Sequence, residues 1–124
     1  MKVCLIGYGK MGKAIEPLLA ERGHELSGIV TRSNSSQLAD FLNHSDVAIE
    51  FTDPESAFDN LLACLEHNVP VVSGTTGWLA QWDDLVGILH QTDGSMLWAS
   101  NFSIGVNVLF EVNRLMSKIM ARLP

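Results

Sequence analysis

The segment KVCLIGYGKMG, residues Lys2 to Gly12, decides the fold of this chain. Its first five residues predict a short apolar strand, and apolar residues at helical spacing follow it. The glycines between them form the pattern G-x-G-x-x-G. In that pattern the first glycine allows a tight turn, the second lets the backbone approach a pyrophosphate, and the third allows a helix to pack closely on a strand. The context predicts a dinucleotide-binding loop whose phosphates meet the free N–H groups of a helix N-terminus. A glycine-rich turn without a ligand is the alternative.

Composition limits the kind of protein this can be. The chain has 124 residues, 47% hydrophobic and 18% charged, which is enough for one globular domain with a core. The net charge is −6 and the basic residues do not cluster, so nucleic acid is not an expected partner. No apolar run approaches the roughly 18 residues of a membrane span, and Gly7 to Lys13 interrupt any signal-peptide core. We therefore expect a cytoplasmic protein without a membrane partner.

Cysteine and histidine usage gives no sign of a metal centre. Cys4 and Cys64 fall in a predicted strand and a predicted helix, without C-x-x-C spacing, and are expected to be buried reduced thiols. The four histidines are scattered singly, so no metal site is expected.

Strand and helix signals alternate along the whole chain. We expect strands over 2–6, 25–31, 46–51, within 68–73, and over 95–99. We expect helices after Gly12 and over 37–42, 54–67, 79–91 and 105–123. This order predicts an α/β fold of the Rossmann type, with a doubly wound, mostly parallel sheet and helices on both faces.

Every glycine-rich or small polar loop follows a strand. These loops are 7–12, 31–36, 52–53, 74–77 and 100–103. Because the carboxyl ends of parallel strands meet at one edge of a sheet, the five loops are expected to line one rim, where ligands of such folds bind.

The residues at the end of the second strand indicate which dinucleotide binds. NAD-specific units usually place an acid there for the ribose 2′-hydroxyl, but this chain has Thr31 and Arg32 followed by polar residues. No carboxylate lies between Glu25 and Asp40. A guanidinium and hydroxyls suit a 2′-phosphate, which favours NADPH, with NADH as the other possibility. Arg32 as a solvated loop residue is the alternative reading. Lys10 either adds charge near the phosphates or lies exposed in the first helical turn.

Three further segments resemble one protein family. They are Asp46 to Glu55 (DVAIEFTDPE), Val71 to Gly77 (VVSGTTG) and Ala99 to Asn107 (ASNFSIGVN). Together with the glycine loop they resemble the N-terminal domain of the dihydrodipicolinate reductase family, over essentially the whole chain. The resemblance implies an enzyme of lysine and diaminopimelate synthesis that transfers a hydride from NADPH or NADH to a cyclic dicarboxylate.

The resemblance also assigns residues to parts of the cofactor. It implies that Gly7, Tyr8, Gly9, Lys10, Met11 and Gly12 hold the pyrophosphate, that Thr31 and Arg32 face the adenosine ribose, and that Phe51 and Thr52 lie along the cofactor. The nicotinamide end is then surrounded by Gly74, Thr75, Thr76, Ala99, Ser100, Asn101 and Phe102. A simple turn is the alternative for Thr75 and Thr76, and a helix-entry contact is the alternative for Asn101.

The chain departs from the family in two respects. Its glycine loop is shorter than in many members, and it contains no counterpart of the family's substrate domain, which carries the catalytic residues. We therefore expect residues 1–124 to be a cofactor-binding domain that binds without catalysis and self-associates through the apolar surface of 108–120. A stand-alone nucleotide-sensing module, and the nucleotide-binding half of an aspartate or homoserine dehydrogenase, are the alternatives.

Overall fold

Five parallel strands form one sheet, in the order β2-β1-β3-β4-β5. The structure, a computed structural model, describes residues 1–122. The strands are β1 (Lys2–Ile6), β2 (Glu25–Val30), β3 (Val47–Glu50), β4 (Val71–Ser73) and β5 (Met96–Trp98). The helices are α1 (Lys10–Glu21), α2 (Leu38–Leu42), α3 (Pro54–Glu66), α4 (Trp82–Leu89) and α5 (Ile104–Met120), with 3-10 turns η1 (Ser35–Gln37) and η2 (Leu79–Gln81). The predicted doubly wound α/β fold is confirmed.

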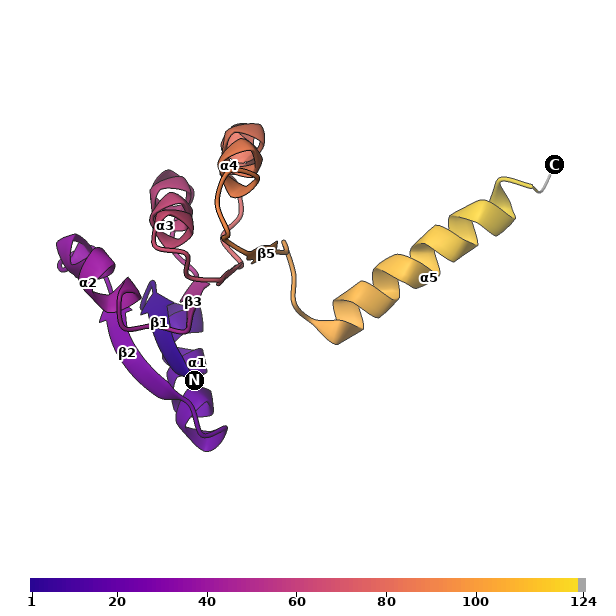
Figure 1. The fold of residues 1–124 in the computed structure, drawn as a ribbon. Helices are drawn as coiled ribbons and strands as arrows, with labels where there is room; N and C mark the ends of the chain where they lie inside the picture. The colour runs from indigo at the N-terminus through magenta and orange to yellow at the C-terminus, as the bar shows by residue number, and fades with distance from the viewer. Residues whose placement is uncertain (123–124) are drawn as a thin grey trace.

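The two faces of the sheet carry different helices. Helices α2, α3 and α4 lie on one face and α1 lies on the other (Figure 1). Right-handed crossovers require this arrangement, because the chain moves from β1 to β2 in one direction and from β2 towards β5 in the other. The larger core lies under α3 and α4, where Leu61, Leu65 and Leu85 are fully buried.

One row of side chains on the α1 face becomes progressively more exposed along the sheet. The strand registers pair Leu5 with Ile49, Ile49 with Val72, and Val72 with Leu97. Leu5 is fully buried, whereas Leu97 on the edge strand β5 is 58% exposed. The β5 side of this face is therefore open.

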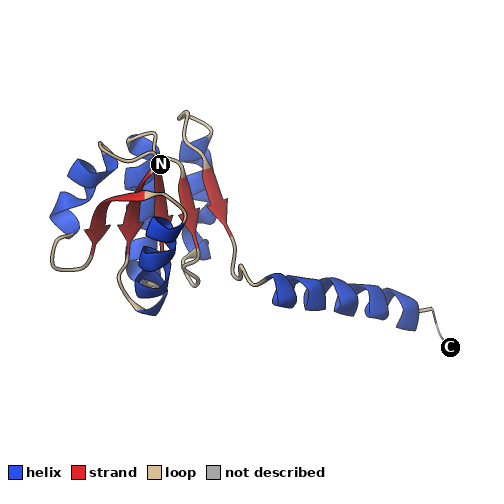
Figure 2. Ribbon diagram, turned by 90° about the horizontal axis from the view of Figure 1, so that it is seen from below, coloured by secondary structure: helices blue, strands red, loops and turns tan. Residues whose placement is uncertain are grey.

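Helix α5 extends away from the sheet and its other helices (Figure 2). Its N-terminus is capped by Ser103, whose hydroxyl accepts from the Val106 N–H. The helix ends at Met120 within the described residues, whereas Leu123, the predicted end, lies outside them. No helix within residues 1–122 is long and apolar enough to cross a membrane.

Most element boundaries differ from prediction by a few residues. Thr31, Phe51 and Ala99 leave the strand ladders to enter rim loops, so the strands are shorter than expected. The helix predicted over 79–91 begins as the turn η2 and ends at Leu89. The cysteines are buried and free, as predicted, and burial raises the pKa of the Cys4 thiol to about 11.

Candidate functional site

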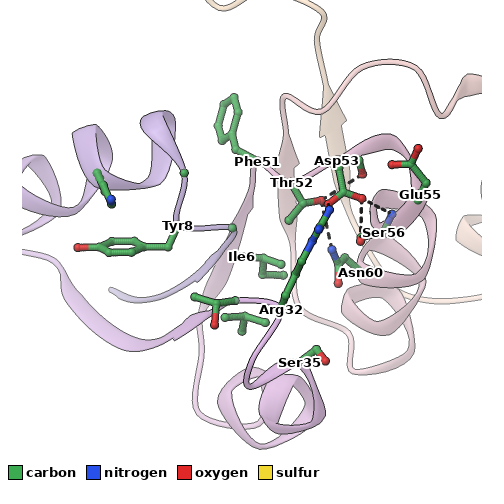
Figure 3. Close-up of a pocket in the computed structure, with 15 residues that line it drawn as sticks. Ile6, Tyr8, Arg32, Ser35, Phe51, Thr52, Asp53, Glu55, Ser56 and Asn60 are labelled. Carbon is green, nitrogen blue, oxygen red and sulfur yellow. Dashed lines mark hydrogen bonds and ion pairs between the residues drawn. The ribbon is translucent and has the colours of Figure 1, made fainter.

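A cavity of about 840 Å³ lies at the carboxyl ends of β1, β2 and β3 (Figure 3). The crossovers from β1 and from β2 leave in opposite directions, so a crevice opens between β1 and β3 at this edge. The cavity is lined by Ile6, Gly7, Tyr8, Gly9, Lys13, Val30, Thr31, Arg32, Ser35, Phe51, Thr52, Asp53, Glu55, Ser56 and Asn60. Seven of the predicted site residues are among them, and all three strand-end loops contribute.

The turn between β1 and α1 has the geometry that its glycines predict. Gly7 has a φ of +96°, in the left-handed region, and a Cβ there would overlap the carbonyl of Phe51. A Cβ on Gly12 would overlap the carbonyl oxygen of Gly7, so the third glycine permits the close approach of helix and turn. A Cβ on Gly9 would meet nothing within 4 Å. The backbone at Gly9 is thus open to a ligand.

The N-terminus of α1 can accept an anion. Within the described chain, no side chain caps this helix: Gly9 occupies the N-cap without a side-chain hydrogen bond. The first N–H groups of a helix lack intrahelical acceptors and carry the positive end of its dipole. A cavity lined by this turn therefore fits a pyrophosphate.

The other loop residues divide into those in the cavity and those beside it. Tyr8 lines the cavity, and its hydroxyl hydrogen-bonds the Glu16 carboxylate, which raises the pKa of Tyr8. Lys13 also lines the cavity, and its Nζ lies 5.8 Å from the centre of the Tyr8 ring. Lys10 and Met11 are exposed in the first helical turn and outside the cavity lining. Lys10 thus takes the second of its two alternatives, an exposed position in the first turn, and the lysine that lines the cavity is Lys13, one turn further along α1.

The loop after β2 is ordered by its own side chains. Asn34 accepts from the Thr31 N–H at 2.7 Å and from the Thr31 hydroxyl at 2.9 Å, and it donates to the Ile29 carbonyl. Arg32 reaches from this loop to the loop after β3, where its Nη2 lies 3.0 Å from Asp53 Oδ2. Thr31 and Arg32 both line the cavity. Figure 3 shows Arg32 reaching across it towards Asp53.

A buried carboxylate joins the loops after β3 and β4. Glu50 is fully buried and accepts from the Thr52 N–H at 3.0 Å, from the Thr52 hydroxyl, from Ser73 at 2.5 Å and from the Thr75 hydroxyl at 2.8 Å. The Thr75 oxygen also accepts from the Thr52 N–H at 2.8 Å. These bonds give a buried carboxylate the partners that its burial requires. Glu50 therefore fixes two rim loops relative to each other.

Two tryptophans hold the backbone of the Gly74–Gly77 loop. The indole N–H groups of Trp78 and Trp98 both donate to the Thr75 carbonyl, at 2.9 and 2.8 Å. Their rings pack edge to face with centroids 6.4 Å apart, and the Trp82 ring packs against both, with centroids 5.8 Å from Trp78 and 5.9 Å from Trp98. Thr75 is 5% exposed and turned inward, whereas Thr76 is exposed at the rim.

The predicted nicotinamide-end residues lie outside the cavity lining, on the continuation of the same rim. The Phe51 ring lies against Gly74, where a Cβ would overlap it, and packs edge to face with Phe102 at 6.3 Å. Ala99 is half-buried, and Ser100 and Phe102 are exposed. Asn101 accepts from the Ser103 N–H at 2.7 Å, the helix-entry contact weighed as its alternative.

Sequence reasoning missed several residues of the cavity wall. Ser35, Glu55, Ser56 and Asn60 line it although none was a site candidate. Asp53 was expected only as part of the rim loop 52–53 and not as a cofactor contact, yet it lines the cavity. It also caps α3, because its side chain accepts from the Ser56 N–H.

Comparison with known proteins agrees with this geometry. Residues 1–102 match the family model described as dihydrodipicolinate reductase, N-terminus. A curated relative, the 4-hydroxy-tetrahydrodipicolinate reductase of Christiangramia forsetii, is 41% identical over 97% of this chain and 50% of its own length. The chain thus spans about half the length of the curated relatives that it matches.

Solved structures show the same fold at lower identity. A dipicolinate-bound dihydrodipicolinate reductase from Paenisporosarcina sp. TG-14 gives a TM-score of 0.61 at 24% identity, over 85% of this chain and 49% of that one. A hyperthermophilic archaeal homoserine dehydrogenase in complex with NADPH also gives 0.61, at 14% identity over 78% of this chain and 43% of that one. The family model and the curated relative, rather than these folds, decide the assignment: the chain belongs to the dihydrodipicolinate reductase family and matches its N-terminal domain.

Proposed function

We propose that residues 1–124 form the nicotinamide-dinucleotide-binding domain of a reductase that acts on 4-hydroxy-tetrahydrodipicolinate. The observation that carries the proposal is the cavity at the carboxyl end of β1, with the open backbone of Gly9 and the uncapped start of α1 on its wall. Family membership supplies the reaction and its place in lysine and diaminopimelate synthesis. A cytoplasmic location is part of this proposal.

The cofactor is proposed to lie along the rim from β2 to β5. Its adenosine ribose faces Thr31 and Arg32, its pyrophosphate lies on residues 7–12, and its nicotinamide lies against residues 74–76 and 99–102. The contacts between neighbouring rim loops support this path, since Thr75 bonds Thr52 and Phe51 packs on Phe102. The dinucleotide supplies the hydride, and this chain binds and orients it.

We propose NADPH as the preferred cofactor, with NADH also accepted. The exposed guanidinium of Arg32 lies at the end of β2, where a 2′-phosphate of the adenosine ribose would meet it. The resemblance implies that the catalytic residues lie in a substrate domain, outside the N-terminal domain that this chain matches. This chain is therefore expected to bind cofactor without turning over the dicarboxylate.

Tryptophan fluorescence tests the proposed cofactor path. All three tryptophans of the chain lie in the cluster beside the Gly74–Gly77 loop. Bound NADPH is expected to quench their emission and to gain nicotinamide emission by energy transfer. Adenosine 2′,5′-bisphosphate, which lacks nicotinamide, is the control and is expected to compete without transfer. NADPH binding without energy transfer would contradict the proposed nicotinamide position.

We also propose that the chain self-associates through α5. Between Val108 and Met120 the helix exposes apolar side chains that are 46–63% accessible: Val108, Leu109, Phe110, Val112, Leu115, Met116, Ile119 and Met120. Apolar surfaces of this kind are usually covered by another chain. Sedimentation velocity is expected to show a concentration-dependent oligomer that Leu115→Glu dissociates. A monomer at high protein concentration would contradict the proposal.

A further inference from the structure

We propose that Asp53 is a specificity-determining residue that weakens the preference for a 2′-phosphorylated dinucleotide by holding Arg32. The inference rests on the proposed function and adds a residue from a different loop to the recognition of the adenosine ribose. Sequence reasoning had found no acid near the end of β2, but the fold supplies one from the end of β3.

The ion pair spans the carboxyl end of β1. Arg32 follows β2 and Asp53 follows β3, and these strands flank β1 on its two sides. Arg32 Nη2 and Asp53 Oδ2 lie 3.0 Å apart, and both residues line the cavity (Figure 3). A ligand entering between the two loops therefore meets the guanidinium already engaged by a carboxylate.

The two partners differ in how firmly they are held. Asp53 caps α3: its Oδ1 accepts from the Ser56 N–H at 3.0 Å and from the Ser56 hydroxyl at 2.9 Å. The pKa of Asp53 is lowered to about 2, chiefly by the hydrogen bond from Arg32, so the carboxylate is charged at neutral pH. The Arg32 side chain is 88% exposed, and Asp53 is its only hydrogen-bond partner within residues 1–122. The aspartate is the fixed member of the pair, and the arginine is the member that can turn to a ligand.

The negative charge of Asp53 affects the binding of the two cofactors differently. A 2′-phosphate must draw Arg32 away from Asp53, or share it, while lying near a fixed negative charge. Glu55 lies on the same wall and adds to the negative charge near Arg32. A 2′-hydroxyl carries no charge to be repelled. Asp53 therefore costs NADPH affinity and leaves NADH affinity almost unchanged.

The variant Asp53→Asn isolates this effect. Asparagine caps helices about as well as aspartate, so its side-chain oxygen preserves the bonds to Ser56 while the charge is removed. We expect the Kd for NADPH to fall about three- to fivefold, the upper part of the range of a surface charge pair, and the Kd for NADH to change less than twofold. Asp59→Asn, an exposed acid of α3 outside the cavity lining, is the matched control and is expected to leave both Kd values unchanged.

Calorimetric titration with NADPH and NADH, at two salt concentrations, provides the test. The difference between wild type and Asp53→Asn is expected to shrink at high salt, because exposed charges are screened. If the wild type binds both dinucleotides and Asp53→Asn has the same ratio of NADPH to NADH affinity as the wild type, this inference is overturned and the proposed function remains intact. A folded wild type that binds neither dinucleotide would overturn both.

Discussion

Replacing Gly9 with alanine separates cofactor binding from folding. An added Cβ would meet nothing within 4 Å, so the methyl group fits the protein without a clash. The residue is the N-cap of α1, where alanine is poorer than glycine by about 1 kcal/mol or less. For a domain of this size that lowers the melting temperature by a few degrees at most.

The same methyl group would stand on the wall of the cavity, between the backbone and a bound pyrophosphate. Each hydrogen bond between a backbone N–H and a charged phosphate contributes about 1.5–3 kcal/mol. Losing one of them lowers affinity roughly 10- to 100-fold, since about 1.4 kcal/mol corresponds to a factor of ten. Gly9→Ala should therefore bind NADPH at least about tenfold more weakly while remaining folded.

Gly12→Ala is the matched comparison. Its methyl group would overlap the carbonyl oxygen of Gly7, and overpacking of this kind costs about 1–3 kcal/mol. Thermal unfolding and NADPH titration should show Gly12→Ala losing both stability and binding, and Gly9→Ala losing binding alone. Unchanged NADPH affinity in Gly9→Ala would refute the placement of the pyrophosphate on this turn.

Three further outcomes follow from buried and charged groups. Glu50→Leu should lower the free energy of unfolding by about 3 kcal/mol or more, because it leaves several inward-facing donors unpaired. Glu50→Gln keeps one acceptor oxygen and should lower it by about 1 kcal/mol. Equal losses for the two variants in urea denaturation would contradict the hydrogen-bond network around Glu50. Because the folded-state pKa of Asp53 is about 2, below its ordinary value of 3.8, its stabilisation is complete above pH 4 and is lost as pH falls towards 2. Asp53→Asn should show a shallower acid loss of stability in that window, and an unchanged acid profile would contradict the ion pair. Cys4 and Cys64 should react with a thiol reagent at pH 8 only after unfolding, because burial raises the pKa of both thiols; rapid labelling of the folded chain would contradict their burial.

The fold could be predicted from sequence because its signals are local. The glycine pattern of residues 7–12 determines the conformation of a few neighbouring residues, and the alternating strand and helix signals each cover one short segment. The structure confirms both, with Gly7 at positive φ and five parallel strands separated by helices or helical turns. Element boundaries were less accurate because they depend on where a strand leaves its ladder, which is a tertiary property.

The parts of the site that sequence did not reveal depend on pairs distant in the chain. Asp53 meets Arg32 only because β2 and β3 flank β1, and Glu50 meets Ser73 only because β3 pairs with β4. The order of strands decides both contacts, and alternating strand and helix signals do not specify that order. Glu50 is also hard to recognise, because a charged residue inside an apolar strand is uncommon and its partners are on other elements.

Calorimetric titration of residues 1–124 with NADPH tests the central claim most directly, alongside circular dichroism to establish that the chain is folded. The account predicts that each chain binds one NADPH. It also predicts that Arg32→Ala lowers the affinity for NADPH more than the affinity for NADH. A folded chain that binds neither NADPH nor NADH at millimolar concentration would contradict it.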